Sequence, residues 1–414
     1  MKFPYSLNIS KYLPAFIILF FIGISFTLSA QNSQTNSIPS ASNHNTLNST
    51  NTASASIQKG KYYIDNGQIR LGIDLDRGGS IFYFALSTNQ VNLLNHADEG
   101  RFIQQSYYGE SDGSTWGGKP WVWNPIQGGG SNGLKAKVLR QELGTNALRV
   151  ISEPVHWGYG TPMPELEMEE EILLCQEVAR IRYTFRNTST NATDHPAAHQ
   201  ELPAVFVDAA YPIMVYYKGD KPWTGAELTR VTPGWPNEYH IRNEEWAAYV
   251  NTNSYGLGVY TPGTPESTAY RYLPEGPQRD KTGPQAAACS YFAPIRTLAI
   301  TRGLTFQYEL YLRIGTIEDI RQTFDQIRCG LHPAATTPFP EKIISENEKS
   351  SSLIIRTISP VGATNVYFVP RTEKTKLTPK NTKTKKTAKT LKTPKTFPSE
   401  DDLENEGYPP QSSQ

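Results

Sequence analysis

The sequence predicts an all-β fold, a large antiparallel β-sandwich with one short helix. Apolar residues recur in many short segments with the two-residue period of strands. Aromatic residues make up 11% of the chain, and its frequent Gly and Pro residues favour turns between strands. Only residues 317–328 carry a convincing helical period. Many strands with turns between them and a single helix are typical of a large sandwich or barrel.

The first predicted element is a β-hairpin. Residues 69–76 alternate apolar and polar, residues 77–79 turn the chain, and residues 80–84 form the return strand. Downstream, strands are predicted at residues 134–140, 148–153, 166–174, 178–186, 204–207, 246–250, 256–260, 297–300 and 304–314. The helix predicted at 317–328 has four apolar side chains on one face.

The amino-terminal end is typical of an exported protein. A basic start, an apolar run from Leu13 to Leu28 and small residues before Gln31 predict a signal peptide at residues 1–30. The alternative is an uncleaved membrane anchor, because the run approaches the length of a bilayer span. Residues 31–56 are rich in Ser, Thr and Asn, which predicts a disordered leader. We therefore expect a secreted or periplasmic protein.

The rest of the chain divides into three parts. The sandwich domain is expected at residues 57–340, followed by a short strand-containing extension at 341–370. Residues 371–414 begin with repeated Lys, Thr and Pro, which predicts a disordered tail. The tail is a candidate for contact with a cell wall or acidic glycans, and the alternative is a solvated extended segment.

Composition and motifs exclude several classes of function. With 40 basic and 39 acidic residues the net charge is +1, so no global field favours nucleic acid. No membrane contact is expected after signal cleavage, since no other stretch is apolar enough. Cys175, Cys289 and Cys329 lack metal-site spacing, and at most one pair could form a disulfide. The motifs of nucleotide, acyl-hydrolase and zinc-protease sites are absent, so no cofactor is expected, while a divalent metal is left open.

A first polar cluster occupies residues 92–109. Arg forks bind hydroxyls or carboxylates in pairs, and side-chain amides suit adjacent sugar hydroxyls. We therefore predict a polar-ligand site that contains His96, Asp98, Arg101, Gln104, Gln105, Tyr107 and Tyr108. The alternative is an ion pair between Asp98 and Arg101 that braces a turn, with the tyrosines packed in the core.

A second candidate region is the Gly- and Pro-rich stretch 112–130. Three of the seven tryptophans, Trp116, Trp121 and Trp123, fall within eight residues of each other, and Asn124 follows. Indole faces stack on the C–H faces of sugar rings, which makes this loop a candidate sugar platform. The alternative is that the tryptophans cap the end of the sandwich core.

A third candidate pair is His199 and Glu201. If a strand begins at Gln200, side chains two apart project to the same face, and an imidazole beside a carboxylate can exchange protons or bind a metal. A structural histidine is the alternative. Weaker candidates of the same kind are Glu244, Glu245, His156 and His240. The acidic residues of 165–171 are interpreted as a solvated strand face.

Several motifs resemble a known superfamily. The run Asn-His-x-Asp-x-Gly-Arg-x-Ile-Gln-Gln-Ser-Tyr-Tyr from Asn95, the Pro-Trp-x-Trp-Asn-Pro loop, and residues 200–205 and 256–260 resemble secreted bacterial proteins of the galactose-mutarotase-like β-supersandwich class. The resemblance spans most of residues 60–330. It implies the supersandwich fold and a carbohydrate ligand. It leaves the reaction open, because the superfold also occurs in glycoside hydrolases, polysaccharide lyases and sugar epimerases.

The resemblance implies different roles for these residues in each reaction. An aldose mutarotase would use His199 or His96 as acid and Glu201, Glu244 or Glu245 as base, with Arg101 as an anchor. The mutarotase Glu lies late in the chain, however, and no late Glu here sits in a matching motif. A lyase would use Tyr107, Tyr108 or His199 as base, with Arg101 and Gln105 on a uronate carboxylate.

A glycoside hydrolase would instead pair Asp98 with Glu201, since such enzymes use two carboxylates about 5 to 9.5 Å apart. We therefore expect a secreted carbohydrate-active enzyme, a hydrolase or lyase that acts on a poly- or oligosaccharide. The alternatives are a non-catalytic glycan-binding protein that uses the tryptophan loop, and a cell-surface structural protein.

Overall fold

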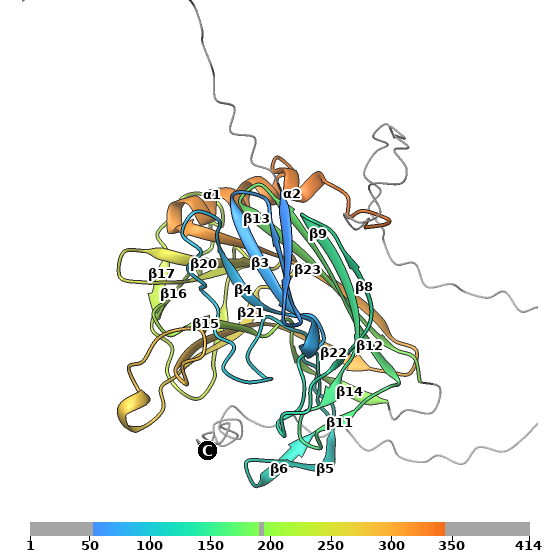
Figure 1. The fold of residues 1–414 in the computed structure, drawn as a ribbon. Coiled ribbons are helices and arrows are strands. Elements are labelled where there is room, and N and C mark those ends of the chain that lie inside the picture. The colour runs from blue at the N-terminus through green and yellow to red at the C-terminus, as the bar shows by residue number, and fades with distance from the viewer. Residues whose placement is uncertain (1–52, 190–193, 344–414) are drawn as a thin grey trace, which may run out of the picture. The chain divides into compact units, whose positions relative to one another are not determined.

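The computed structural model describes residues 53–189 and 194–343 (Figure 1). The expected signal peptide, most of the expected leader, residues 344–370 of the extension and the whole tail lie outside these residues. The first strand begins at Ser54, three residues before the expected start of the domain. In the described part of the chain, no helix has the length and apolarity needed to cross a membrane.

A nine-stranded antiparallel sheet forms one layer of the sandwich. Its strand order is β17-β16-β19-β20-β23-β13-β12-β9-β8. The strands are β8 (Lys137–Leu143), β9 (Ala147–Glu153), β12 (Leu166–Cys175), β13 (Val178–Asn187), β16 (Ile213–Tyr216), β17 (Thr229–Val231), β19 (Trp246–Val250), β20 (Tyr255–Tyr260) and β23 (Thr305–Thr316).

Two smaller sheets lie against it. One contains β1 (Ser54–Gln58), β2 (Lys61–Asp65), β3 (Ile69–Asp74) and β4 (Ser80–Leu86). The other has the order β14-β22-β21-β18, with β15 also paired to β22; its strands are β14 (His195–Glu201), β15 (Val205–Asp208), β18 (Glu238–Ile241), β21 (Glu266–Tyr272) and β22 (Cys289–Ile300). The pairing of β14 with β22 shifts register between His195 and Ala198.

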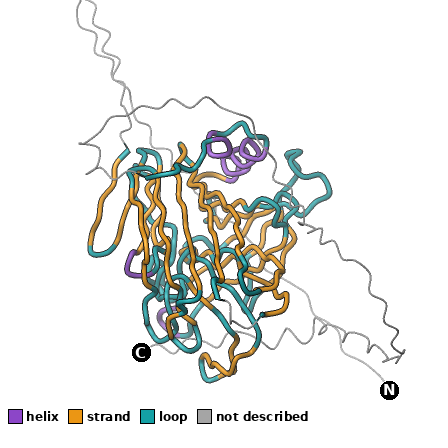
Figure 2. Tube along the Cα trace, turned by 90° about the vertical axis from the view of Figure 1, so that its right-hand side faces the viewer, coloured by secondary structure: helices purple, strands orange, loops and turns teal. Residues whose placement is uncertain are grey.

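The remaining strands are short, and two 3-10 turns accompany the strands. The β5 (Ser111–Trp116) and β6 (Lys119–Val122) strands form a separate hairpin, and β7 (Pro125–Ile126), β10 (Val155–His156) and β11 (Thr161–Pro162) form a small sheet. The two 3-10 turns are η1 (Leu75–Arg77) and η2 (Gly276–Gln278). Strands and loops make up most of the trace in Figure 2.

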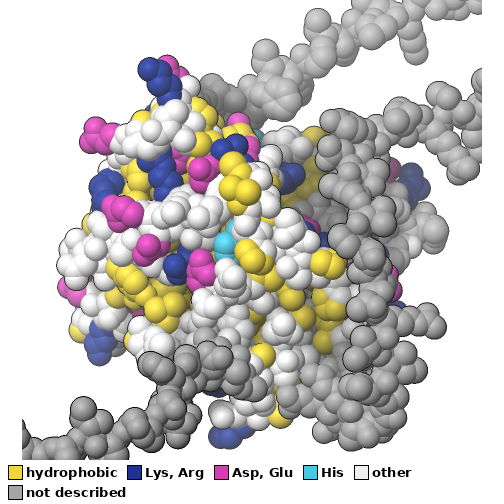
Figure 3. All heavy atoms as spheres, turned by 90° about the horizontal axis from the view of Figure 1, so that it is seen from above, with side chains coloured by type: hydrophobic (Ala, Val, Ile, Leu, Met, Phe, Trp, Pro, Cys, Tyr) yellow, Lys and Arg dark blue, Asp and Glu magenta, His cyan; other side chains and the backbone are white. Residues whose placement is uncertain are grey.

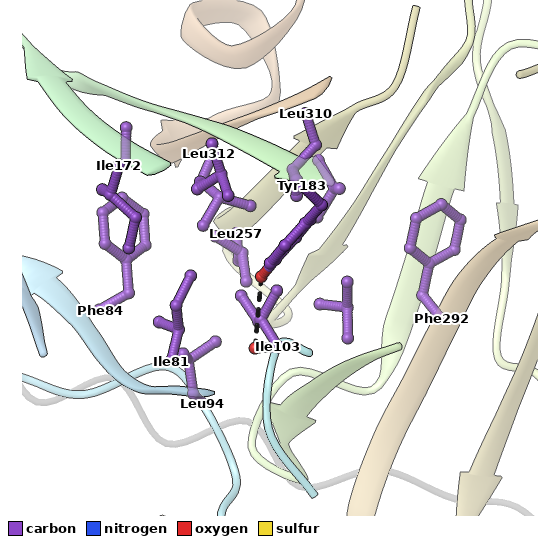
Figure 4. Close-up of a cluster of buried hydrophobic side chains, with 14 of the residues drawn as sticks. Ile81, Phe84, Leu94, Ile103, Ile172, Tyr183, Leu257, Phe292, Leu310 and Leu312 are labelled. Carbon is purple, nitrogen blue, oxygen red and sulfur yellow. Dashed lines mark hydrogen bonds between the residues drawn. The ribbon is translucent and has the colours of Figure 1, made fainter. Parts of the chain in front are cut away.

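The main core lies between the large sheet and the smaller ones. Phe84 of β4, Ile172 of β12, Leu312 of β23 and Phe292 of β22 belong to one cluster of buried apolar side chains (Figure 4). These residues come from three different sheets. The sandwich predicted from the two-residue period is therefore confirmed.

The predicted helix is confirmed as α1 (Ile317–Arg328). Thr316 caps its first turn through a capping box with Asp319, which satisfies amide groups that the helix itself leaves free. Its apolar face packs on the outer side of the large sheet, against Trp246 and Tyr260, and the short α2 (Pro333–Thr336) follows. A second core thus covers the face opposite the main one.

Charged side chains of both signs are intermixed over the face of the described residues shown in Figure 3. On this face no broad area carries a single sign of charge. Recognition of a ligand must therefore come from local groups rather than from a large uniform field.

Candidate functional site

A cavity beside the smaller sheets brings together three stretches of sequence that are far apart. It is bounded by the loop at residues 98–108, by the β5–β6 hairpin, and by strands β14, β21 and β22. Half of its lining residues are aromatic, and its charged side chains are Asp98, Arg101 and Glu201. We call this cavity the aromatic pocket. Apolar walls with a few convergent polar groups are typical of small-molecule sites.

Tryptophans form one wall of the aromatic pocket. The Trp116 ring lies edge-on to Trp121 at 5.0 Å between centroids and edge-on to Trp157 at 5.6 Å. Trp121 also donates a hydrogen bond from Nε1 to Asn124 Oδ1 at 3.2 Å. Buried Asn124 is fixed in turn by its bond to the Tyr107 carbonyl, at 2.7 Å. The hairpin therefore presents its tryptophans in a fixed arrangement.

The opposite wall comes from β21, β22 and the loop before β18. Tyr270 and Tyr291 are register partners on adjacent strands, and their rings stack at 4.5 Å. Trp235 lies edge-on to Tyr270 at 4.8 Å and to Tyr272 at 5.3 Å. Strand pairing thus places an aromatic surface across from the tryptophan wall.

Glu201 is the carboxyl at the centre of this arrangement. It ends β14 and is only 8% exposed. Its Oε2 accepts hydrogen bonds from the hydroxyls of Tyr108 and Tyr291, both at 2.7 Å, and Oε1 accepts one from Asn237 Nδ2 at 3.4 Å. Burial raises the pKa of Glu201, and the three hydrogen bonds oppose this rise only in part. Among the described residues, no Lys or Arg forms an ion pair with it.

The neighbouring residue fixes the loop that carries Tyr108. Buried Gln200 accepts a hydrogen bond from the Tyr108 amide at 2.6 Å and donates one to the Tyr108 carbonyl at 2.8 Å. Successive strand residues project to opposite faces, so Gln200 holds the loop while Glu201 reaches the pocket. This explains how the hydroxyl of Tyr108 meets the carboxyl of Glu201.

Asp98 and Arg101 form the second charged group in the aromatic pocket. Arg101 Nε lies 3.0 Å from Asp98 Oδ2, and Arg101 Nη1 donates to the Ala287 carbonyl at 2.6 Å. The guanidinium carbon is 5.5 Å from the centroid of Tyr272. The turn-bracing ion pair considered from the sequence is therefore present, and both of its members also line the pocket.

The structure places eight of the thirteen predicted site residues in the aromatic pocket. They are Asp98, Arg101, Gln104, Tyr108, Trp116, Trp121, Asn124 and Glu201. The other five lie outside its lining: His96, Gln105, Tyr107, Trp123 and His199.

Two of these five are part of the core. Tyr107 is fully buried, its ring is 4.2 Å from Phe185, and its hydroxyl donates to Gln105 Oε1 at 3.1 Å. Gln105 donates to the Glu169 carbonyl at 3.0 Å and so connects its loop to β12. Both residues support the layer beneath the pocket.

The remaining three face other surroundings. His96 lies edge-on to Phe82 at 5.3 Å, and burial lowers its pKa to about 4. Trp123 packs against His195 at 4.4 Å. His199 is exposed, with its ring 6.0 Å from Tyr239, because it precedes the buried end of β14. No histidine lines the aromatic pocket, so the histidine acid of the mutarotase arrangement is not placed there.

The weaker candidates have structural partners. Glu244 forms an ion pair with Arg321 at 2.5 Å and accepts from Trp246 Nε1 at 2.9 Å. The further contacts are His156 with Asp112 at 2.7 Å, His240 with the Tyr216 hydroxyl at 3.1 Å, and Glu245 with the Gly263 amide at 2.9 Å.

The expectation that the acidic face of β12 is solvated was wrong. Glu169 and Glu171 are buried, and Glu171 pairs with Arg149 at 2.5 Å and Arg182 at 3.3 Å. These arginines stand directly opposite Glu171 on β9 and β13. On the other face of the strand Glu170 is fully buried, and burial raises its pKa to about 8. The alternation was predicted correctly, but the cross-strand arginines were not foreseen.

Several pocket residues were not found from the sequence, among them Trp157, Trp235, Tyr270, Tyr272 and Tyr291. Asn237, which donates to Glu201 but is not part of the pocket lining, was also missed. The one available signal was the Tyr-x-Tyr alternation at residues 270–272, which predicts two rings on one face of a strand. Within residues 53–189 and 194–343, no three His, Cys, Asp or Glu side chains are arranged to hold a metal ion. All three cysteines are free.

Comparisons with known proteins found similarity to this chain only among solved structures. No protein-family model and no curated protein matches the chain. A putative aldose 1-epimerase from Escherichia coli K12 is 14% identical with a TM-score of 0.41, covering 62% of this chain and 99% of that chain. A galactose mutarotase-like protein from Lactobacillus casei is also 14% identical, with a TM-score of 0.40 over 62% and 100% of the two chains.

Proposed function

We propose that this protein is a secreted carbohydrate-active enzyme, of glycoside hydrolase or polysaccharide lyase type, with Glu201 as its central catalytic residue. The observation that carries the proposal is the environment of that carboxyl, which is buried among aromatic side chains and held by two tyrosine hydroxyls. A raised pKa suits a group that must give up or take a proton near neutral pH. The amino-terminal signal pattern supports secretion.

In the hydrolase reaction, Glu201 is the general acid. It protonates the glycosidic oxygen while the bond from that oxygen to the anomeric carbon breaks. Asp98, held beside Arg101, is the second carboxylate. It accepts a proton from the water that attacks the anomeric carbon, or attacks that carbon itself. Two carboxyls in different environments are the usual basis for such a division of roles.

The Tyr108–Glu201 hydrogen bond also favours a lyase reaction. Tyr108 passes its proton to Glu201 and, as a phenolate, removes the proton next to a uronate carboxylate. Arg101 balances the charge of that carboxylate. The C4–O bond then breaks, a C4–C5 double bond forms, and the departing oxygen takes up the proton that Glu201 received. Hydrolysis and elimination differ in their products, which makes them separable by experiment.

A binding protein without catalysis is the second candidate. It is favoured by the fixed Trp116–Trp121–Trp157 wall, which offers faces for sugar rings without any reaction. Arg101 and Glu201 are also each already hydrogen-bonded within the protein. A glycan could then be held by stacking alone.

The test uses the purified full chain with galactan, xylan and dextran as neutral polysaccharides and alginate and polygalacturonate as uronic ones. New reducing ends together with ultraviolet absorbance indicate a lyase, and reducing ends alone indicate a hydrolase. We expect Glu201→Gln to lower the rate by at least about a hundredfold, the lower range for general acid–base catalysis. Glu167→Gln, on the far side of β12, is the matched control and should leave the rate unchanged. A wild-type rate in Glu201→Gln overturns the role of Glu201; binding without products supports the second candidate.

A further inference from the structure

A row of exposed apolar side chains leads away from the aromatic pocket. Trp235 is 40% exposed, Tyr239 56% and Ile241 45%. Tyr239 and Ile241 are alternate residues of β18 and project to the same side, and Trp235 lies in the bend before the strand. We call Trp235, Tyr239 and Ile241 the exposed row. Single exposed apolar residues are ordinary on protein surfaces, but a contiguous set that continues a pocket indicates a binding surface.

The exposed row is continuous with the pocket at Trp235. This ring lines the pocket and packs edge-on against Tyr270 and Tyr272. Asn237, which lies between Trp235 and the start of β18, donates to Glu201 Oε1 at 3.4 Å. The row therefore passes directly beside the proposed catalytic carboxyl.

His199 extends the polar part of this surface. Its exposed ring lies 6.0 Å from the ring of Tyr239, and it stands two residues before Glu201 on β14. A hydroxyl-rich ligand stacked on Tyr239 would thus find a hydrogen-bonding imidazole at its edge. This gives the predicted site residue His199 a place outside the pocket but next to it.

The length of the row bears on the size of the ligand. Trp235 packs against Tyr270 of β21, and Ile241 at the other end of the row stands opposite Glu266 on the same strand. At the rise of a strand, the four residues from Glu266 to Tyr270 span about 13 Å. A single sugar ring is shorter than this, so a ligand that follows the whole row and also reaches Glu201 must contain several linked sugars.

We propose that the exposed row is an outer part of the binding site and that the ligand is consequently a polysaccharide rather than a mono- or disaccharide. The inference rests on the proposed carbohydrate function and adds the substrate class. Trp235 and Tyr239 stack on successive rings of the chain, and the aromatic pocket holds the unit on which Glu201 acts.

The test compares long and short ligands of one sugar. With whichever of the five polysaccharides the unaltered protein binds, and with the disaccharide of the same linkage, the dissociation constant is measured for Tyr239→Ala and Trp235→Ala. We expect Tyr239→Ala to weaken polymer binding about three- to tenfold, the range for loss of one aromatic contact, and to leave disaccharide binding unchanged. Tyr239→Phe keeps the ring and should bind like the unaltered protein. Leu331→Ala, which shortens an exposed apolar side chain between α1 and α2, is the control.

Each outcome decides a specific point. Equal losses for polymer and disaccharide, or no loss for either, overturn the role of the exposed row in polymer binding. If the unaltered protein binds no carbohydrate, the proposed function fails and the inference fails with it. A third outcome concerns β18, the last strand of its sheet, since such edges can pair with another protein strand. If Ile241→Lys turns an oligomer into a monomer by light scattering without affecting polymer binding, the row is a protein contact instead.

Discussion

Two groups of buried carboxyls in this protein are stabilised in opposite ways. On the outer face of β12, Glu171 lies between Arg149 and Arg182, and Glu169 pairs with Arg186. In the aromatic pocket, Glu201 has two tyrosine hydroxyls and an amide instead. Arginine partners favour the charged carboxylate, whereas burial with neutral donors raises the pKa. The arginine-paired carboxylates link neighbouring strands, whereas the surroundings of Glu201 suit a carboxyl that gains and loses a proton.

The inner face of β12 sharpens this comparison. Glu170 is one residue from the arginine-paired carboxylates, yet it faces the core, where Gln127 Nε2 donates to it at 2.9 Å. Burial raises the pKa of Glu170 to about 8. Strand alternation therefore separates a charged face and a neutral one within a single element.

The largest predicted effect is on the pH dependence of stability, in the variant Glu170→Gln. The folded chain keeps this proton up to about pH 8, whereas the unfolded chain loses it near its ordinary pKa of 4.5. Its contribution to stability is therefore complete below about pH 4.5 and is lost as the pH rises to about 8, at up to about 1.4 kcal/mol per pH unit. The variant keeps the acceptor for Gln127, and we expect its free energy of unfolding to lose this dependence on pH. Urea unfolding at several pH values measures the free energy. The same pH dependence in the variant and the unaltered protein would contradict the neutral state of Glu170.

The next effect concerns Glu171→Ala. Removal of this carboxylate leaves Arg149 without its shortest cross-strand partner and removes one of the two carboxylates that pair with Arg182, and breaking a buried ion pair costs about 3 kcal/mol or more. We expect the free energy of unfolding to fall by about that amount, as measured by urea titration at neutral pH. Glu201→Gln, which keeps an acceptor for both tyrosines, should lose much less. A similar loss in both variants would remove the distinction between the two groups.

A smaller effect is expected from Tyr291→Phe. The Tyr291 hydroxyl is one of the donors that hold down the pKa of Glu201. Its removal should raise that pKa further, because a hydrogen bond to the charged form is lost. The limb of the pH–rate profile that reports Glu201 should therefore move to higher pH. A uniform loss of rate with no shift would indicate that Tyr291 only shapes the pocket.

The smallest effect on stability is expected for Glu167→Gln. This residue pairs with Arg140 at 3.5 Å, and the Arg140 side chain is largely exposed. Exposed ion pairs contribute less than about 1 kcal/mol, so the urea midpoint should hardly move at physiological salt. A loss as large as that of Glu171→Ala would mean that the outer face of β12 acts as one network.

Local patterns in the sequence were sufficient for some elements and not for others. The helix at 317–328 and the hairpin at 69–84 were predictable because their periods and turns lie within a few residues of each other. The run that contains Asp98 and Tyr108 combined polar types that scaffolds rarely concentrate. Tyr291 and Trp235, by contrast, line the same pocket as Glu201 only through the pairing of β18, β21 and β22, which no local pattern specifies.

The same limit explains the misplaced residues. His199 and Glu201 were considered beside a strand that begins at Gln200, whereas β14 ends at Glu201. The local pattern does not tell where a strand passes from the surface into the interior. The charged face of β12 looked solvated because its arginine partners lie on β9 and β13, more than ten residues away along the chain. Whether a side chain is buried depends on which strands lie beside its own, and this strand order could not be predicted from the sequence.

The register shift of β14 between His195 and Ala198 determines which side chain reaches the pocket. Because neighbouring strand residues point in opposite directions, one residue more or fewer in this short stretch would exchange the positions of Gln200 and Glu201. An amide would then face the two tyrosines, and a carboxylate would meet the backbone of Tyr108. The length of this irregularity is therefore as much a part of the proposed active site as the acid itself, and a relative with a different length there would not be expected to share its chemistry.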